Sequence, residues 1–273
     1  MAKALVNGIH IDYDVQGSGM PLLVIPGLGF SRDLWRDQIS DLSRRYKVAV
    51  ISQRGHGDSD KPKGKENYSL PIFVEDVRLL LDHLGIERKV ILIGHSLGAK
   101  VVQLFCLTHP ERVQAAVLVT PLTGERPKGP AEGEFGQEQI REVQQMGWSA
   151  YLNYLQPLLF APGTDPQFVK ELVRDCYKIP EYAYIAIVSK AMAYELEDHI
   201  AKITVPVLLI AGAGDQRIPV EEQEKMNRLL PNSWLQVIKG AGHMPQLEKP
   251  VETTRSILRF LSCVETWSDE GLA

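Results

Sequence analysis

The feature that most constrains the fold is an alternation of short apolar runs with helical stretches. Five continuous runs rich in Val, Ile and Leu occur in the 273 residues: PLLVIPG, KVAVISQ, KVILIG, VQAAVLVT and VPVLLIAG. Strands that are apolar on both faces are typical of a parallel sheet covered on both sides. Helical spacing follows the first three runs, over 33–44, 69–84 and 97–109, which indicates βαβ units with right-handed crossovers. The sequence therefore predicts an α/β fold.

Both ends of the chain extend this pattern. Asn7-Gly8 lies between two short alternating runs and predicts a β-hairpin whose turn needs positive φ. Near the other end, SWLQVIKG at 233–240 predicts a last strand, and a final helix is expected over 251–263. The polar tail after it is expected to fray.

The alternation breaks between 121 and 201. A connection rich in Gly, Pro and charge comes first, and several helical patterns carrying aromatic residues follow. We expect an insertion of about four short helices, with breaks at Pro157, at Pro162 and Pro166, and at Pro180.

Composition excludes several classes of partner. The 34 acidic and 30 basic residues are well mixed and give a net charge of −4, so nucleic acid and anionic membranes are not expected partners. No apolar stretch approaches the roughly 20 residues that a membrane span needs. Cys106, Cys176 and Cys263 are widely spaced and form no metal or disulfide pattern. Mostly buried, reduced thiols and no signal peptide predict a cytoplasmic protein.

The most informative local motif is the G-x-S-x-G pattern centred on Ser96, which joins the third apolar run to the helix predicted after it. The motif is weak by itself, but a strand before it and a helix after it are the context of a nucleophilic serine. Glycine is expected at positions 94 and 98 because so sharp a turn brings these two positions together, and side chains there would collide. Ser96 is then expected to adopt strained dihedrals at a helix N-terminus. An ordinary structural turn is the alternative.

A serine hydroxyl needs a base, and the chain has seven histidines. His243, in GAGHMPQLEKP, directly follows the last predicted strand, and α/β folds place their chemistry at the C-terminal ends of strands. The other histidines fit less well: His95 adjoins Ser96 and should point elsewhere, His109 ends a helix, and His199 lies in a connection. His243 is therefore the predicted base.

The acid that orients this base should also follow a buried strand. Asp215 comes directly after VPVLLIAG, whereas the preceding strand ends near Thr120 with no carboxylate before Glu125. A helix N-cap role is the alternative for Asp215. The order Ser96, Asp215, His243 is the chain order of the α/β-hydrolase arrangement and differs from that of other serine triads.

A tetrahedral intermediate also needs N–H donors for its oxyanion. The backbone N–H of Leu97, which follows the serine, is the first predicted donor. The loop after the first apolar run, PGLGF, should supply the second, from Leu28. The same loop could open a dinucleotide-binding fingerprint, but Arg32 occupies the position of its third glycine.

Five segments taken in order, PGLG, SQRGHGDSD, GHSLGA, AGAGDQRIP and GAGHMPQLEKP, resemble the α/β-hydrolase fold superfamily over essentially the whole chain. More narrowly, the chain is similar to small carboxylesterases, enol-lactonases, C–C bond hydrolases and cofactor-free perhydrolases. The resemblance implies a mostly parallel eight-stranded sheet flanked by helices. It also implies a core domain at 1–120 and 202–273, with a helical cap at 121–201 inserted after strand six.

Two positions depart from the family pattern. The family often has His-Gly at the oxyanion loop, where this chain has Pro26-Gly27. Because the donor is a backbone N–H, the oxyanion hole is expected to survive. Gln53 replaces the Asp of the family's Asp-x-Arg-Gly motif, and the rest of that segment is expected to be structural: Arg54, Gly55 and Gly57.

The sequence thus predicts a serine hydrolase that needs no metal and no cofactor. Its substrate is expected to be a small or medium, largely apolar ester or lactone, cleaved through an acyl-enzyme. Phe30, Trp148 and Met244 are candidate substrate contacts.

Two alternatives stay open at this point. C–C bond hydrolysis of a diketone, or perhydrolysis, would use the same three catalytic residues. A ligand receptor that retains the triad is the alternative of another class, because a fold does not fix a function. Monomer and homodimer are equally compatible with the sequence.

Overall fold

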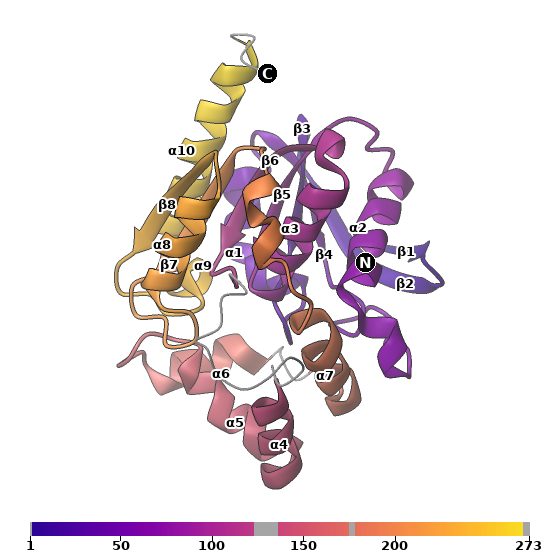
Figure 1. Cartoon of the computed structure of the whole chain (residues 1–273), viewed down its shortest axis with the longest axis vertical. Coiled ribbons are helices and arrows are strands. Elements are labelled where there is room, and N and C mark those ends of the chain that lie inside the picture. The colour runs from indigo at the N-terminus through magenta and orange to yellow at the C-terminus, as the bar shows by residue number, and fades with distance from the viewer. Residues whose placement is uncertain (1, 123–135, 175–177, 270–273) are drawn as a thin grey trace.

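An eight-stranded sheet organises the protein (Figure 1). The structure is a computed structural model that describes residues 2–122, 136–174 and 178–269. The sheet order is β1-β2-β4-β3-β5-β6-β7-β8, and every neighbouring pair from β4 to β8 is parallel. The strands are β1 Ala2–Val6, β2 Ile9–Gln16, β3 Met20–Ile25, β4 Tyr46–Ile51, β5 Val90–His95, β6 Val113–Val119, β7 Val207–Gly212 and β8 Ser233–Ile238. The predicted mostly parallel sheet is confirmed.

The two N-terminal strands form the predicted hairpin. β1 and β2 pair antiparallel, with Val6 opposite Ile9, and β2 pairs antiparallel with β4. Asn7 and Gly8 have φ of 48° and 75°, the positive values that a two-residue hairpin turn requires.

Helices cover both faces of the sheet, as expected for buried parallel strands. Alternate residues of β3 show this: Leu23 and Ile25 face one apolar cluster, whereas Leu22 and Val24 face the other. The first cluster includes residues of α2 Leu70–His83, α3 Leu97–Thr108 and α8 Val220–Leu229. The second includes residues of α1 Arg36–Leu42, α9 Pro245–Glu248 and α10 Pro250–Asp269. The continuous apolar runs are therefore explained by burial on two sides.

In the described part of the chain between β6 and β7 lie four α-helices, called the inserted helices below: α4 Gln137–Met146, α5 Trp148–Leu158, α6 Pro166–Val173 and α7 Glu181–Ile187. α4, α5 and α6 form a group at the bottom of Figure 1, beyond one end of the strands. The breaks expected before Pro166 and Pro180 are present, but Pro157 lies inside α5, next to its end. The division into core domain and cap domain stays a prediction.

The C-terminal helix is longer than its pattern predicted. α10 continues to Asp269, so the expectation of a frayed tail is wrong for residues 264–269. The reason lies at its last described turns, where Val264 is buried in the second apolar cluster and the Tyr46 hydroxyl donates to Glu265 (2.7 Å). Within the described ranges, no helix has the length and apolar character needed to cross a bilayer.

Two of the three cysteines fall among the described residues. Cys106 is buried in α3, where burial raises the pKa of its thiol to about 12, and Cys263 is exposed. Neither is in a disulfide. Cys176 lies outside the described residues.

Candidate active site

Ser96 lies in a strained turn between β5 and α3. Its φ of 50° and ψ of −112° lie outside the regions that L-residues ordinarily occupy. The Ser96 N–H donates to the Val119 carbonyl (3.0 Å), and the Ser96 carbonyl accepts the Lys100 N–H of α3 (3.1 Å). The turn is thus fixed by a neighbouring strand and by the helix that it opens. Strain of this kind is held by the surrounding fold.

The two glycines of the motif are required by close backbone approach. A Cβ on Gly94 would overlap the backbone of Gly98, and a Cβ on Gly98 would overlap the carbonyl oxygens of Ile25 and Pro26. Gly94 pairs with Ile25 across β5 and β3, so the loops after these strands begin side by side. The strand pairing therefore places the Leu97 N–H next to the loop that carries Leu28.

His243 and Asp215 meet at the ends of β8 and β7. The Nδ1–H of His243 donates to Oδ2 of Asp215 (2.8 Å), and both side chains are buried. This bond fixes the proton on Nδ1, so the other ring nitrogen of His243, Nε2, is left as an acceptor. Ser96 and His243 line one cavity. The structure thus brings together the three residues that sequence reasoning selected.

Asp215 is held as a carboxylate. Burial by itself would raise its pKa, but the charge of His243 and the hydrogen bonds to the carboxylate outweigh burial and set the pKa below its ordinary value. Besides His243, the backbone N–H groups of Arg217 and Ile218 donate to Oδ1 (2.8 and 3.0 Å). Its side chain is therefore fixed on both oxygens.

His95, which was expected to point elsewhere than Ser96, supports the backbone of His243. Its Nε2–H donates to the carbonyl oxygen of His243 (2.9 Å), and the two rings lie 5.1 Å apart between centroids. Burial, with a smaller contribution from His243, lowers the pKa of His95 to about 3, so it stays neutral. The Thr120 hydroxyl donates to the same carbonyl (3.4 Å) from a residue with φ of 44°. Sequence spacing gave no signal for either contact, because His95 ends β5, Thr120 follows β6 and His243 follows β8, and only the sheet order brings these strand ends to one edge.

Glu248 connects the loop that carries His243 to the loop between α5 and α6. Its carboxylate accepts the N–H of Gly242 (2.6 Å), which precedes His243 in the chain. It also accepts the Ala161 N–H (2.8 Å) and the Thr164 hydroxyl (3.2 Å), both from the loop between α5 and α6. Gly242 packs so closely on Phe160 and Ala161 that a Cβ would overlap their backbone. A single carboxylate thus connects the two regions beside the base.

The loop that carries Leu28 is supported by a residue at which the chain departs from the family pattern. Gln53 Nε2–H donates to the Pro26 carbonyl (2.7 Å), and the His95 ring packs against Gly27. Arg54 instead forms a buried, two-pronged ion pair with Asp76 (2.5 and 2.6 Å), which agrees with a structural role. Gln53 therefore fixes the loop that carries Leu28.

The cavity at Ser96 has a volume of about 290 Å³. Its lining comes from strand-end loops, from α4 and from the turn after α7: Ser96, Leu122, Gln139, Met192, Gln216, Arg217, Ile218 and His243. Gln216 and Arg217 follow Asp215 directly in the sequence, and this adjacency could have identified them as residues of the site. Gln139 and Met192 reach the site only through the placement of the inserted helices.

The three candidate substrate contacts do not line this cavity. Met244 is fully buried in the second apolar cluster, together with Phe30, whose ring stands edge-on to His95. Trp148 packs on Tyr151 and Tyr184 within the inserted helices. In each case packing against the chain itself accounts for the apolar side chain. Their contact with substrate stays a prediction.

Ionisable side chains around the site do not gather as metal ligands. Among the residues that the structure describes, no group of three His, Cys, Asp or Glu side chains is arranged to hold a metal ion. The Asp215 carboxylate is instead hydrogen-bonded to His243 Nδ1 and to two backbone N–H groups.

Comparison with known proteins identifies the family. The α/β hydrolase fold family model matches residues 20–176 and 148–250, and the chain belongs to this family. An esterase from Thermogutta terrifontis is 26% identical, with a TM-score of 0.85 over 96% of this chain and 98% of the other.

Two further relatives have names that refer to other substrates, a lactone and an epoxide. Est816, described as an N-acyl homoserine lactone degrading enzyme, is 25% identical, with a TM-score of 0.82 over 94% of this chain and 99% of that one. Epoxide hydrolase 4 from Homo sapiens is 26% identical over 93% of this chain and 76% of its own length. The common element in the three names is degradation or hydrolysis, which supports a hydrolase, while the bond differs.

Proposed function

We propose that the protein is a serine hydrolase that cleaves a small or medium ester or lactone through an acyl-enzyme. The observation that carries the proposal is the hydrogen bond from His243 Nδ1 to Asp215 in a site where His243 and Ser96 line one cavity. A carboxylate that holds Nδ1–H leaves Nε2 to take the serine proton, as in a Ser-His-Asp triad.

In the first half of the reaction, the Ser96 oxygen attacks the carbonyl carbon while its proton passes to His243 Nε2. The carbonyl oxygen becomes an oxyanion, and the N–H groups of Leu97 and Leu28 are the proposed donors to it. The Leu97 N–H belongs to the first turn of α3, where no helical carbonyl is available to accept it. Collapse of the intermediate expels the alcohol, which takes the proton from His243.

In the second half, water attacks the acyl group on Ser96 with His243 again as the base. Expulsion of the serine oxygen, which regains the proton, releases the carboxylic acid. Asp215 keeps the imidazole in one tautomer and stabilises its protonated form throughout. The chain's own groups are sufficient for each of these steps.

The substrate class is argued from the lining and from the relatives. Leu122, Met192 and Ile218 give the cavity an apolar side, and its volume suits a small acyl or alkoxy group. Two relatives that are about a quarter identical are described as an esterase and as an N-acyl homoserine lactone degrading enzyme, which supports an ester or a lactone as the substrate. We propose that the inserted helices act as a cap over this site.

The proposal is tested by steady-state hydrolysis of p-nitrophenyl acetate, butyrate and octanoate, together with a γ-lactone and a diketone. We expect turnover of the esters and a loss on the order of 10⁴- to 10⁶-fold in Ser96→Ala. Ser189→Ala, which removes a serine hydroxyl from the inserted region, is the matched control and should keep full activity. Undiminished turnover by Ser96→Ala, or turnover of the diketone alone, would overturn the proposal.

A further inference from the structure

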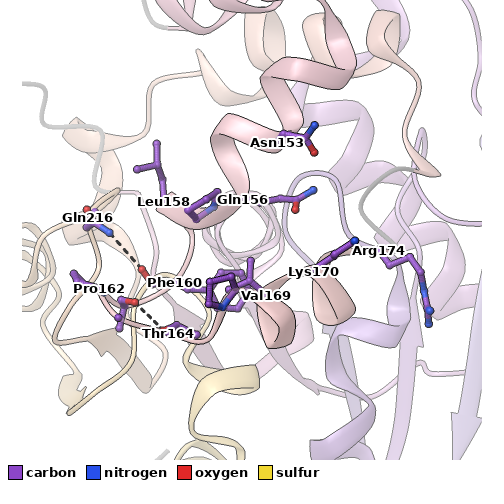
Figure 2. A pocket seen from close by; sticks show the side chains of 14 residues that line it. Asn153, Gln156, Leu158, Phe160, Pro162, Thr164, Val169, Lys170, Arg174 and Gln216 are labelled. Atoms are coloured by element: carbon purple, nitrogen blue, oxygen red, sulfur yellow. Dashed lines mark hydrogen bonds between the residues drawn. The ribbon is translucent and has the colours of Figure 1, made fainter.

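A second cavity, larger than the Ser96 cavity and beside it, is lined by basic side chains that would suit a negatively charged ligand. It has a volume of about 580 Å³ and adjoins the Ser96 cavity at Gln216, which lines both. It lies between α5, α6 and the loop that joins them (Figure 2). A volume of this size accommodates most of a small organic ligand.

The wall next to Gln216 is apolar. Leu158, Phe160 and Val169 contribute to it, together with three prolines: Pro157, Pro162 and Pro166. Gln216 Nε2–H donates to the Phe160 carbonyl (3.4 Å), which fixes this wall against the residue that follows Asp215. An alkyl chain that leaves the Ser96 cavity here would therefore meet hydrocarbon first.

The far end is cationic. Figure 2 shows Gln216 at one end of the cavity and Arg174 at the other, with Lys170 nearer to Arg174. Lys170 lies on α6, and Arg174 follows four residues later as the C-cap of this helix, still in helical conformation, so the two side chains lie on the same side. Within the described part of the chain, the structure gives neither of them an ion-pair partner.

Neutral donors accompany the two cations. Gln156 is in the wall, and its Nε2 atom is buried without a hydrogen-bond partner among the described residues. Among the residues that the structure describes, no Asp or Glu lines the cavity, although acidic residues outnumber basic residues in the chain as a whole. A buried amide N–H without an acceptor costs free energy, and a bound oxygen acceptor would remove that cost.

We infer that this cavity is an anion-recognising subsite for the substrate of the proposed hydrolase. The substrate is then an ester or lactone in which an apolar chain connects the reacting carbonyl group to a carboxylate. The chain lies along Leu158, Phe160 and Val169, and the carboxylate meets Lys170, Arg174 and Gln156. Arg guanidinium and Lys ammonium groups are suited to a carboxylate because both donate charge-assisted hydrogen bonds.

The inference rests on the proposed function, and the test separates the two. Two matched pairs of esters are compared: mono-p-nitrophenyl adipate with p-nitrophenyl hexanoate, and 6-acetoxyhexanoate with hexyl acetate. The first pair carries the carboxylate on the acyl side and the second on the alkoxy side. We expect kcat/KM for the anionic member of one pair to exceed that of its neutral partner about threefold to thirtyfold, a preference that falls at high salt.

The double variant Lys170→Ala/Arg174→Ala should abolish this preference and leave kcat/KM for the neutral ester unchanged. Arg141→Ala/Lys190→Ala, which removes two cations of the inserted region that line neither cavity, should keep the preference. Equal rates within both pairs, or a preference lost only in Arg217→Ala, would overturn the subsite and leave the hydrolase intact. Hydrolysis of none of the four esters would contradict the proposed function instead.

Discussion

The strand ends and the inserted helices differ in how firmly they hold their functional groups. At the strand ends, Ser96, Asp215 and His243 are each less than 9% exposed, and neighbouring loops bind their backbones or side chains. In the inserted region, Lys170 on α6 and Arg174 at the C-cap of that helix are exposed. The proposed reaction geometry is therefore set by the sheet. The proposed selectivity depends on exposed side chains of the inserted region.

Removing one hydrogen bond from each region should give the largest difference in kcat between two variants. Asp215→Asn puts an amide where the His243 Nδ1–H needs an acceptor, so we expect kcat to fall about 10⁴-fold through the wrong tautomer. Tyr151→Phe removes the buried hydrogen bond to Tyr184 (2.8 Å) and should cost about 0.5–1.5 kcal/mol of stability with little change in kcat. Steady-state kinetics and urea unfolding measure both. Similar losses of kcat in the two variants would show that the strand ends and the inserted helices do not differ in their effect on catalysis.

The second prediction concerns the residue that connects the two regions. Glu248→Gln turns an amide toward the N–H groups of Gly242 and Ala161, so the His243 loop should shift. We expect kcat to fall about tenfold to a hundredfold, as small displacements of a catalytic group do, with a smaller change in KM. Glu252→Gln, an exposed carboxylate one turn later, is the control with the same change of charge. Activity of Glu248→Gln within twofold of the parent would show that the connection does not position the base.

The third and smallest effect is acid sensitivity of the core. Burial lowers the pKa of His56 to about 4 and that of His95 to about 3, below the ordinary value of 6.5. Because the unfolded chain takes up protons first, the stability that these neutral histidines contribute is fully present above about pH 6.5. It is lost as the pH falls toward 4 and 3, by up to about 1.4 kcal/mol per pH unit for each.

Urea unfolding at pH 7, 6 and 5 checks this dependence. His56→Asn should reduce the loss of stability between pH 6 and pH 5 by up to half, because one of the two histidines with a pKa lowered by burial is gone. His199→Asn, which replaces an exposed histidine near the end of the insertion, should leave the loss unchanged. Equal pH dependence in the parent and His56→Asn would contradict burial as the cause.

The strand ends were predictable because their signals are local. A continuous apolar run, a glycine-bounded turn and a polar residue shortly after a strand are all read within about ten residues. Ser96 and Asp215 follow continuous apolar runs, and His243 follows a shorter mixed strand in a glycine-bounded loop. Parallel pairing then brings such residues to the same edge of a sheet. The sequence therefore indicated which side chains meet.

The supporting contacts and the inserted helices were not predictable for the opposite reason. His95 and Thr120 contact the His243 carbonyl from positions more than 100 residues away, and Glu248 connects the same loop to Ala161, 87 residues away. Met244 and Phe30 looked like pocket residues, but an apolar side chain beside a catalytic residue serves the core equally well. Short helices with aromatic residues on several sides give no single apolar stripe, so their lining residues depend on tertiary placement.

The account depends most on Ser96 as the nucleophile. The direct measurement is peptide mass spectrometry of protein quenched in acid during turnover of a p-nitrophenyl ester. We predict the added mass of the acyl group on the peptide that contains Ser96, with a greater share of acylated protein in His243→Ala, where water lacks its base, and none in Ser96→Ala. Turnover without an adduct on Ser96, or an adduct on another residue that persists in Ser96→Ala, would contradict the account.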